Sequence, residues 1–229
     1  MVRYTHFGEG DYHETELAIR ELLVERGVDV SDIAVNGSDG PEVDELAFQA
    51  FNPEDTLTRE LYGGFHRNYS ESGIYTGHAA YYEGAGVTRT YKDPAQHLNH
   101  QLYLQGEWFS GAESIKHGRA TEDYEDYIAL DFNARSANAV VDLEEGVEPF
   151  EVRVTIQDNA TREYRPLLPE EAGIDIAFRD GETYSNVDVG RMYFIASLPE
   201  FGGRELRFSS NSPDFALFAM TFGAYQGVD

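Results

Sequence analysis

The sequence has no cysteine among its 229 residues and only two lysines, Lys92 and Lys116. The absence of cysteine excludes disulfide bonds, thiol redox chemistry, thiolate metal sites and cysteine nucleophiles within this sequence. No segment approaches the ~18 consecutive apolar residues that a transmembrane helix needs. The first six residues also lack the apolar core of a signal peptide. We therefore expect no membrane insertion, a cytoplasmic location by default, and an extracytoplasmic one if the sequence is a fragment of a larger chain.

Basic residues are scarce as well, because 42 Asp and Glu stand against 17 Lys and Arg, which gives a formal net charge of −25. A surface this negative repels phosphate backbones, so we expect no nucleic-acid partner. The acids are spread along the chain rather than collected in one tail, and lysine is almost absent. This distribution is typical of halophilic proteins, in which salt screens the mutual repulsion of many hydrated carboxylates. Hydrophobic residues at 41% and aromatic residues at 13% nevertheless predict a folded domain with a core.

The spacing of apolar residues divides the chain into three regions. Residues 2–7 predict a short strand, and the apolar residues between Asp11 and Gly27 have near-helical spacing, which predicts an amphipathic helix that ends at Gly27. Residues 28–97 are rich in Gly, Asp, Asn, Ser and Pro, and we expect an ordered connector held to the folded body by apolar side chains. From residue 98 the pattern changes to short strands between turn signals.

The region 98–225 predicts a mainly β domain. About eight strands follow one another at about 10-residue spacing with no helix between them, as is typical of an antiparallel β-sandwich. Residues 150–156 and 205–208 alternate apolar and polar side chains strictly. We therefore expect an antiparallel β-sandwich of the jelly-roll type.

Several short motifs occur in a fixed order along nearly the whole chain: His6-Phe7-Gly8-Glu9-Gly10-Asp11-Tyr12, Thr58-Arg59-Glu60-Leu61-Tyr62-Gly63, Leu104-Gln105-Gly106-Glu107-Trp108, Phe132-Asn133-Ala134-Arg135, Arg191-Met192-Tyr193 and Phe218-Ala219-Met220-Thr221-Phe222-Gly223. Together they resemble the C-terminal region of DipZ-type thioredoxin-like (thiol-disulfide isomerase) proteins. In that family a thioredoxin domain is followed by a β-sandwich similar to carbohydrate-binding modules. The resemblance implies that residues 1–27 are a strand–helix remnant of a thioredoxin-like domain, and that 98–225 is a carbohydrate-binding-module-like sandwich. The catalytic C-x-x-C part of that family is absent from this sequence.

Metal binding has weak support in the sequence. His97 and His100 are three residues apart, which in a strand would point their side chains to opposite faces, so we expect surface or turn histidines. The acidic stretches 122–126 and 142–145 offer the oxygen ligands that calcium prefers, but no EF-hand loop is present. We expect no cofactor, with a structural calcium ion as the open alternative.

The aromatic residues give the candidate ligand site. Flat rings accept the apolar faces of sugars while polar side chains fix the hydroxyls, and the chain has 15 tyrosines. The alternative for the single tryptophan is burial in the sandwich core, and the alternative for the arginine is a structural ion pair. The candidate ligand-binding residues are Tyr103, Trp108, Tyr124, Tyr127 and Arg135.

Two functional hypotheses follow. The first is a non-catalytic binding or interaction module of a DipZ-like protein with a possible glycan ligand. The second is an accessory or structural subunit that completes or docks onto a thioredoxin-like partner, or that self-associates into an oligomer, because a lone strand and apolar helix need a cover. No constellation of residues supports a hydrolase, so we do not expect an enzyme.

Overall fold

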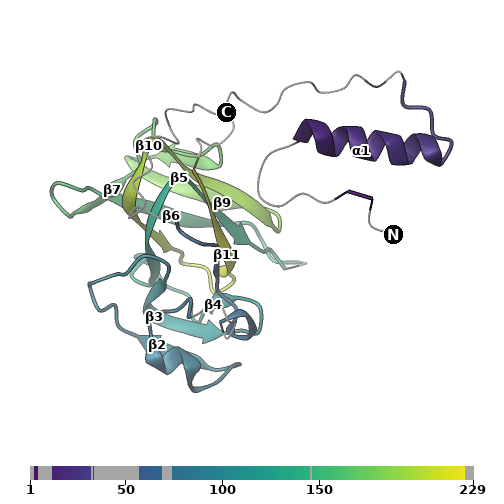
Figure 1. Cartoon of the computed structure of the whole chain (residues 1–229). Coiled ribbons are helices and arrows are strands. Elements are labelled where there is room, and N and C mark those ends of the chain that lie inside the picture. Colours follow the sequence, from purple (N-terminus) through teal and green to yellow (C-terminus); the bar gives the residue numbers. More distant parts are fainter. Residues whose placement is uncertain are drawn as a thin grey trace. The chain divides into compact units, whose positions relative to one another are not determined.

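The computed structural model describes residues 3–4, 12–31, 33, 57–68, 74–144 and 146–224 (Figure 1). The chain divides into two compact units, Met1–Pro53 and Glu54–Asp229. Of the strand predicted at 2–7, Arg3 and Tyr4 have no strand geometry and the other four residues lie outside the described part.

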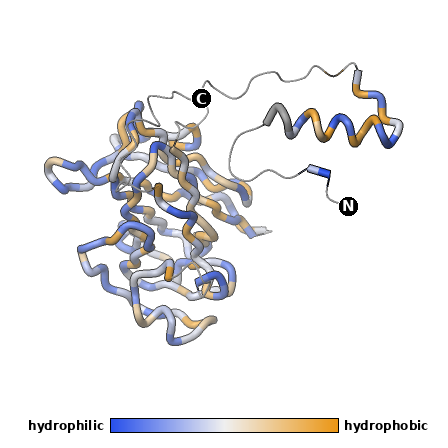
Figure 2. Tube along the Cα trace, viewed as in Figure 1, coloured by the Kyte–Doolittle hydropathy of each residue, from blue (hydrophilic) through white to orange (hydrophobic). Residues whose placement is uncertain are grey.

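The first unit contains the helix α1 (Tyr12–Glu25), as its apolar spacing predicted. The helix ends because Gly27 adopts a φ of 79°, a left-handed conformation that glycine tolerates without strain. Gly27 donates its N–H to the carbonyl of Val24, and Val28 donates to Leu23, so the last carbonyls of the helix are satisfied. Large apolar side chains of this unit stay exposed to solvent, and the helix residues among them are Leu17, Ile19, Leu22, Leu23 and Val24. Figure 2 shows hydrophobic and hydrophilic residues interleaved along this helix.

The second unit is built on one antiparallel sheet, which confirms the mainly β prediction. Along the sheet the strands run in the order β1-β11-β4-β3-β5-β10-β6-β9-β8, with β2 added to β3 and β7 added to β6. The strand bounds are β1 (Leu61–Tyr62), β2 (Thr88–Tyr91), β3 (Leu102–Ser110), β4 (Ile115–His117), β5 (Tyr127–Val141), β6 (Phe150–Gln157), β7 (Tyr164–Pro166), β8 (Ile176–Arg179), β9 (Glu182–Val187), β10 (Arg191–Ser209) and β11 (Ala216–Gly223).

Two short 3₁₀ helices, η1 (Phe65–Arg67) and η2 (Ala79–Glu83), lie in the stretch that the sequence presented as a connector. The same stretch also supplies β1, which pairs with β11, and β2, which pairs with β3. Leu61 is fully buried there. The described residues 57–68 and 74–97 belong to the second unit and supply two strands of its sheet.

The centre of the sheet has one apolar and one polar face. Side chains on opposite faces alternate along a strand, and the core takes every second residue of β5, β6 and β10: Ile128, Leu130, Phe132, Val152, Val154, Ile156, Leu206 and Phe208. The intervening residues lie on the opposite side, which we call the polar face: Tyr127, Asp131, Arg153, Thr155, Glu205 and Arg207. The polar face lies on the central strands β5, β6 and β10, and the candidate site lies on this face.

Candidate ligand-binding pocket

A cavity of about 380 Å³ lies over the polar face. Its volume is in the range of small-molecule sites in proteins. Tyrosine and arginine side chains dominate its lining, and we call it the tyrosine–arginine pocket: Tyr124, Tyr127, Tyr164, Arg153, Arg165 and Arg207.

Strand register brings these residues together from distant parts of the sequence. Tyr127 of β5 lies opposite Ser209 of β10, and Ser209 lies opposite Arg153 of β6. One step along, Arg207 lies opposite Thr155. Because residues in register share a face, two neighbouring rows across these strands form the pocket floor.

Arg207 is held between two aromatic rings. Its guanidinium carbon lies 4.1 Å from the ring centre of Tyr127 and 3.5 Å from that of Tyr164. Its Nη2 also lies 3.3 Å from the carboxylate of Asp93. Cation–π contacts of this kind fix both rings and the guanidinium in one arrangement, so the floor is rigid before any ligand arrives.

A buried chain of polar groups supports this floor. The Tyr127 hydroxyl donates to Asp93 at 2.5 Å, and His97 lies between Asp93 at 2.7 Å and Glu205 at 2.6 Å. Tyr164 donates its hydroxyl to the same Glu205 carboxylate. The side chain of His97 is only 2% exposed. Tyr127 and Tyr164 are therefore connected to each other through one histidine and two carboxylates.

The carboxylates beside His97 favour its protonated, positively charged form. Burial alone would lower the pKa of His97, but the hydrogen bonds and charges of Glu205 and Asp93 outweigh burial and raise it. Burial would raise the pKa of Asp93, but hydrogen bonds from Tyr127, from the backbone of Ala95 and from His97 hold it below its usual range. A positive His97 between two carboxylates stabilises the floor electrostatically.

Asp131 has the opposite behaviour. It lies in register opposite Glu205 on the polar face. Burial, followed by the repulsion of Glu205, raises the pKa of Asp131 to about 6. Its carboxylate therefore becomes protonated more readily than an exposed aspartate.

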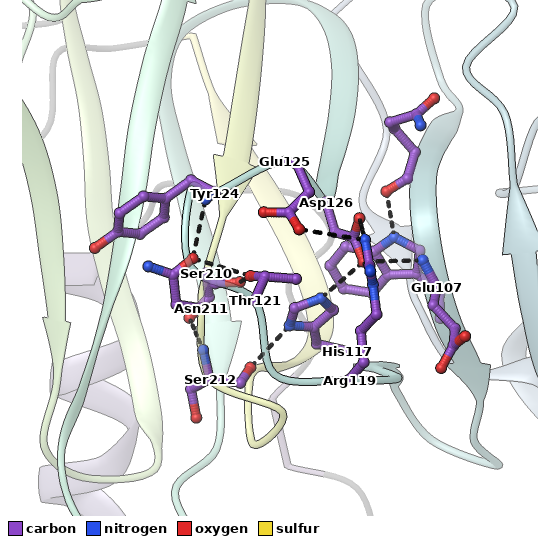
Figure 3. Close-up of polar contacts among 12 residues, drawn as sticks. Glu107, His117, Arg119, Thr121, Tyr124, Glu125, Asp126, Ser210, Asn211 and Ser212 are labelled. Atoms are coloured by element: carbon purple, nitrogen blue, oxygen red, sulfur yellow. Dashed lines mark hydrogen bonds and ion pairs between the residues drawn. The ribbon is translucent and has the colours of Figure 1, made fainter.

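The loop 119–126 forms one wall of the pocket and is held from behind by hydrogen bonds (Figure 3). Tyr124 has a positive φ of 55°, and its N–H donates to the side-chain oxygen of Asn211 at 2.9 Å. The same oxygen accepts the Thr121 hydroxyl at 2.9 Å, while the Asn211 amide donates to the carbonyl of Glu122 at 3.0 Å. Asn211 thus fixes the unusual backbone that turns Tyr124 toward the pocket.

Asp126 anchors the other end of this loop. It is 1% exposed, and its carboxylate accepts from Arg119 at 2.7 and 2.8 Å, from the backbone of Glu107 at 3.0 Å and from His117 at 3.1 Å (Figure 3). Burial would raise the pKa of Asp126, but these partners, with Arg119 the strongest, lower it to about 2. Gly106 packs directly against this carboxylate, and a Cβ there would overlap it.

The sequence-derived ligand residues separate into two groups. Tyr124 and Tyr127 both line the pocket. Tyr103 lies below it, 4% exposed, with its ring stacked on His97 at 4.3 Å. Trp108 is 1% exposed in the core and donates its indole N–H to the carbonyl of Gln105, so the core alternative holds for it and a ligand cannot reach it.

Arg135 lies away from the pocket. Its guanidinium binds the carbonyls of Leu198 and Pro199 rather than a pocket group. The candidate site therefore retains two of the five predicted residues.

Sequence reasoning missed the arginines and the buried histidine. The expectation that His97 is a surface or turn residue is wrong, because two carboxylates bury it. A signal for Arg207 and Arg153 was present, since each is a polar position in a strictly alternating strand and must face away from the core. No sequence signal shows that Glu205 and His97, which are 108 residues apart, meet.

The expected calcium alternative receives no support from the acidic stretch 122–126, since Asp126 is committed to Arg119 and His117. In the described residues, no group of three or more His, Asp or Glu side chains is placed to hold a metal ion. Nor does any helix in the described part have both the length and the apolar character needed to cross a membrane.

Comparisons with known proteins agree on one family. The family model described as "Thioredoxin like C-terminal domain" matches residues 58–223. Protein DipZ of Mycobacterium bovis and Protein DipZ of Mycobacterium tuberculosis are each 30% identical to this chain over 141 residues. The aligned segment is 61% of this chain but only 17% of each of these relatives.

Proposed function

This chain belongs to the thioredoxin-like C-terminal domain family, and from that premise we propose that it is a non-catalytic accessory domain whose tyrosine–arginine pocket binds carbohydrate. The absence of cysteine from the sequence removes the thiol chemistry of a thioredoxin active site. In this proposal the sheet unit acts as a carbohydrate-binding-module-like domain with a jelly-roll sandwich architecture.

One observation carries the proposal: a preformed cavity on the polar face combines three tyrosine rings with hydrogen-bonding side chains. Aromatic rings offer flat apolar surfaces to the C–H faces of a sugar. Arginine and carboxylate groups beside the rings supply donors and acceptors for the hydroxyls. Because Tyr127 and Tyr164 are already fixed by Arg207 and Glu205, binding costs little ordering of these side chains.

A glycan array of neutral and acidic oligosaccharides, followed by titration of the best ligand, tests this function. We expect Tyr124→Ala to weaken binding about tenfold or more, because a buried aromatic contact is removed. Tyr4→Ala is the matched control, since Tyr4 is 37% exposed and lies in the other unit. If the array shows no glycan ligand, or if both variants bind as the native protein does, the proposal fails.

A second candidate function rests on a different observation, the exposed apolar side chains of α1. Leu17 is 45% exposed, Ile19 52% and Val24 59%. Apolar side chains of a helix left in water favour association with a thioredoxin-like partner or with a second copy of the chain. Light scattering in several-molar salt tests self-association, for which a mass near twice 25.7 kDa is expected. A monomer at all concentrations contradicts self-association.

We also propose that the acidic composition is an adaptation to high salt. Its support is the net charge of −25 with two lysines.

A further inference from the structure

We infer that the tyrosine–arginine pocket selects a sugar that carries a single carboxylate, and that Arg153 binds this carboxylate. The inference rests on the proposed carbohydrate-binding function and specifies its ligand class. Its basis is the difference between pocket arginines that have an acidic partner and the one that has none among the described residues.

Two of the three pocket arginines already have acidic partners. Arg165 binds Glu171 at 2.7 Å, and Arg207 lies 3.3 Å from Asp93. The side chain of Arg153, in contrast, has no hydrogen bond or ion pair within the part of the chain that the structure describes. In a chain with 42 acids and 17 basic residues, an arginine that lines a cavity without an ion-pair partner among the described residues is a specific arrangement.

The surroundings of Arg153 orient its guanidinium. Its guanidinium carbon lies 4.7 Å from the ring centre of Tyr124, and this cation–π contact restricts the orientations of both side chains. The Nε atoms of Arg153 and Arg207 are buried and have no hydrogen-bond partner among the described residues. A planar guanidinium held against a ring is suited to bidentate contact with a carboxylate.

The pocket also carries acids, which limit how much negative charge the ligand has. Glu125 is paired with Arg119, whereas Asp123 and Glu182 line the pocket without an ion pair among the described residues. These two carboxylates accept hydrogen bonds from hydroxyls but repel a second anionic group. The expected ligand therefore has one carboxylate and several hydroxyls, as in a uronic-acid-type sugar, and is not a sulfated or phosphorylated polyanion.

The test compares ligands that differ only in charge. Oligosaccharides of galacturonate and of glucuronate are titrated against the protein by calorimetry at about 0.15 M salt, where the Debye length is ~8 Å. Their methyl esters, which have the same rings and hydroxyls, are titrated in the same way. We expect at least one acid to bind about tenfold more tightly than its ester, the scale of a charge-assisted bidentate contact.

Variants assign that preference to a residue. Arg153→Gln should reduce the affinity for the acid to that for the ester. Arg153→Lys should retain part of the preference, because lysine keeps the positive charge but cannot donate the two parallel hydrogen bonds of a guanidinium. Arg67→Gln is the charge-matched control, since Arg67 is 59% exposed and lies outside the pocket. Thermal unfolding of each variant verifies the fold.

The outcomes separate the inference from the function beneath it. If acid and ester bind equally, or if Arg153→Gln keeps the preference for the acid, the inference is wrong and the carbohydrate function stands. If neither class of sugar binds, in this assay and on the array, both are wrong. A preference for the acid that is lost in Arg153→Gln and kept in Arg67→Gln supports both.

Discussion

Burial makes the charge of Asp131 unfavourable for folding at neutral pH. Its pKa is raised to about 6 by burial and by Glu205, whereas the unfolded chain has the ordinary value near 4. A raised carboxyl pKa means that the folded state binds the proton more tightly. The associated stability is complete below about pH 4 and is lost as the pH rises to about 6.

We therefore predict that Asp131→Asn stabilises the protein at pH 7 by about 1–2 kcal/mol, a figure reduced for solvent screening. The difference in unfolding free energy between the variant and the native protein should grow as the pH rises from about 4 to about 6, because only the native protein then gains the buried charge. Urea denaturation at a series of pH values measures both effects. Asp180→Asn, at an exposed turn position, is the control and should leave the profile unchanged. A difference between Asp131→Asn and the native protein that stays constant over this pH range would contradict the assignment.

Gly106 illustrates a residue whose role follows from its neighbour. It has a φ of 94°, and the buried Asp126 carboxylate occupies the space of its missing side chain. We predict that Gly106→Ala destabilises the protein by about 2–4 kcal/mol, because backbone strain and overpacking add. Gly202→Ala is the comparison, since only a distant Arg204 atom at 3.9 Å meets the added Cβ. Equal denaturation midpoints for the two variants would refute this account.

At the scale of elements, the conformation of loop 119–126 depends on Asn211, which lies between β10 and β11. Asn211 makes hydrogen bonds to Thr121, Glu122 and Tyr124. We predict that Asn211→Ala costs about 1–3 kcal/mol and speeds amide hydrogen exchange in residues 121–126. Exchange measured by mass spectrometry tests this. Asn159→Ala, which removes one exposed 3.4 Å contact, should leave the exchange of this loop unchanged.

Elements with strong periodicity were predictable from the sequence. The apolar spacing predicted α1 and its end at Gly27, because the left-handed C-cap is a local property. Strict alternation predicted β6 and the end of β10 around Arg207. What alternation cannot give is which strands pair, since register depends on contacts between residues far apart in sequence.

The pocket could be predicted from the sequence only in part, because its residues are brought together by the pairing of strands far apart in sequence. Tyr124 and Tyr127 stood out as aromatic residues near a strand entry, and both line it. Arg207 and Glu205 come from a strand almost 80 residues later, and they face Tyr127 only because β10 pairs with β5. Trp108 was a weak candidate because a lone tryptophan in a β domain is more often core than surface.

At the scale of the whole molecule, charge dominates. A net charge of −25 destabilises a compact state by self-repulsion at low ionic strength. We predict that the melting temperature rises with KCl into the molar range, with a steep part below about 1 M, where the Debye length shrinks from ~10 Å to ~3 Å. Calorimetric scans in a KCl series measure the melting temperature. A melting temperature that is equally high at low salt would contradict the proposal of salt adaptation.

The central claim is that the tyrosine–arginine pocket binds carbohydrate. Saturation-transfer NMR with the best glycan of the array, on the native chain and on Tyr124→Ala, tests it most directly. The account predicts transfer to the sugar ring protons in the native chain, loss of that transfer in Tyr124→Ala, and retention in Tyr4→Ala. Transfer of equal strength in all three proteins would place the ligand elsewhere and contradict the claim.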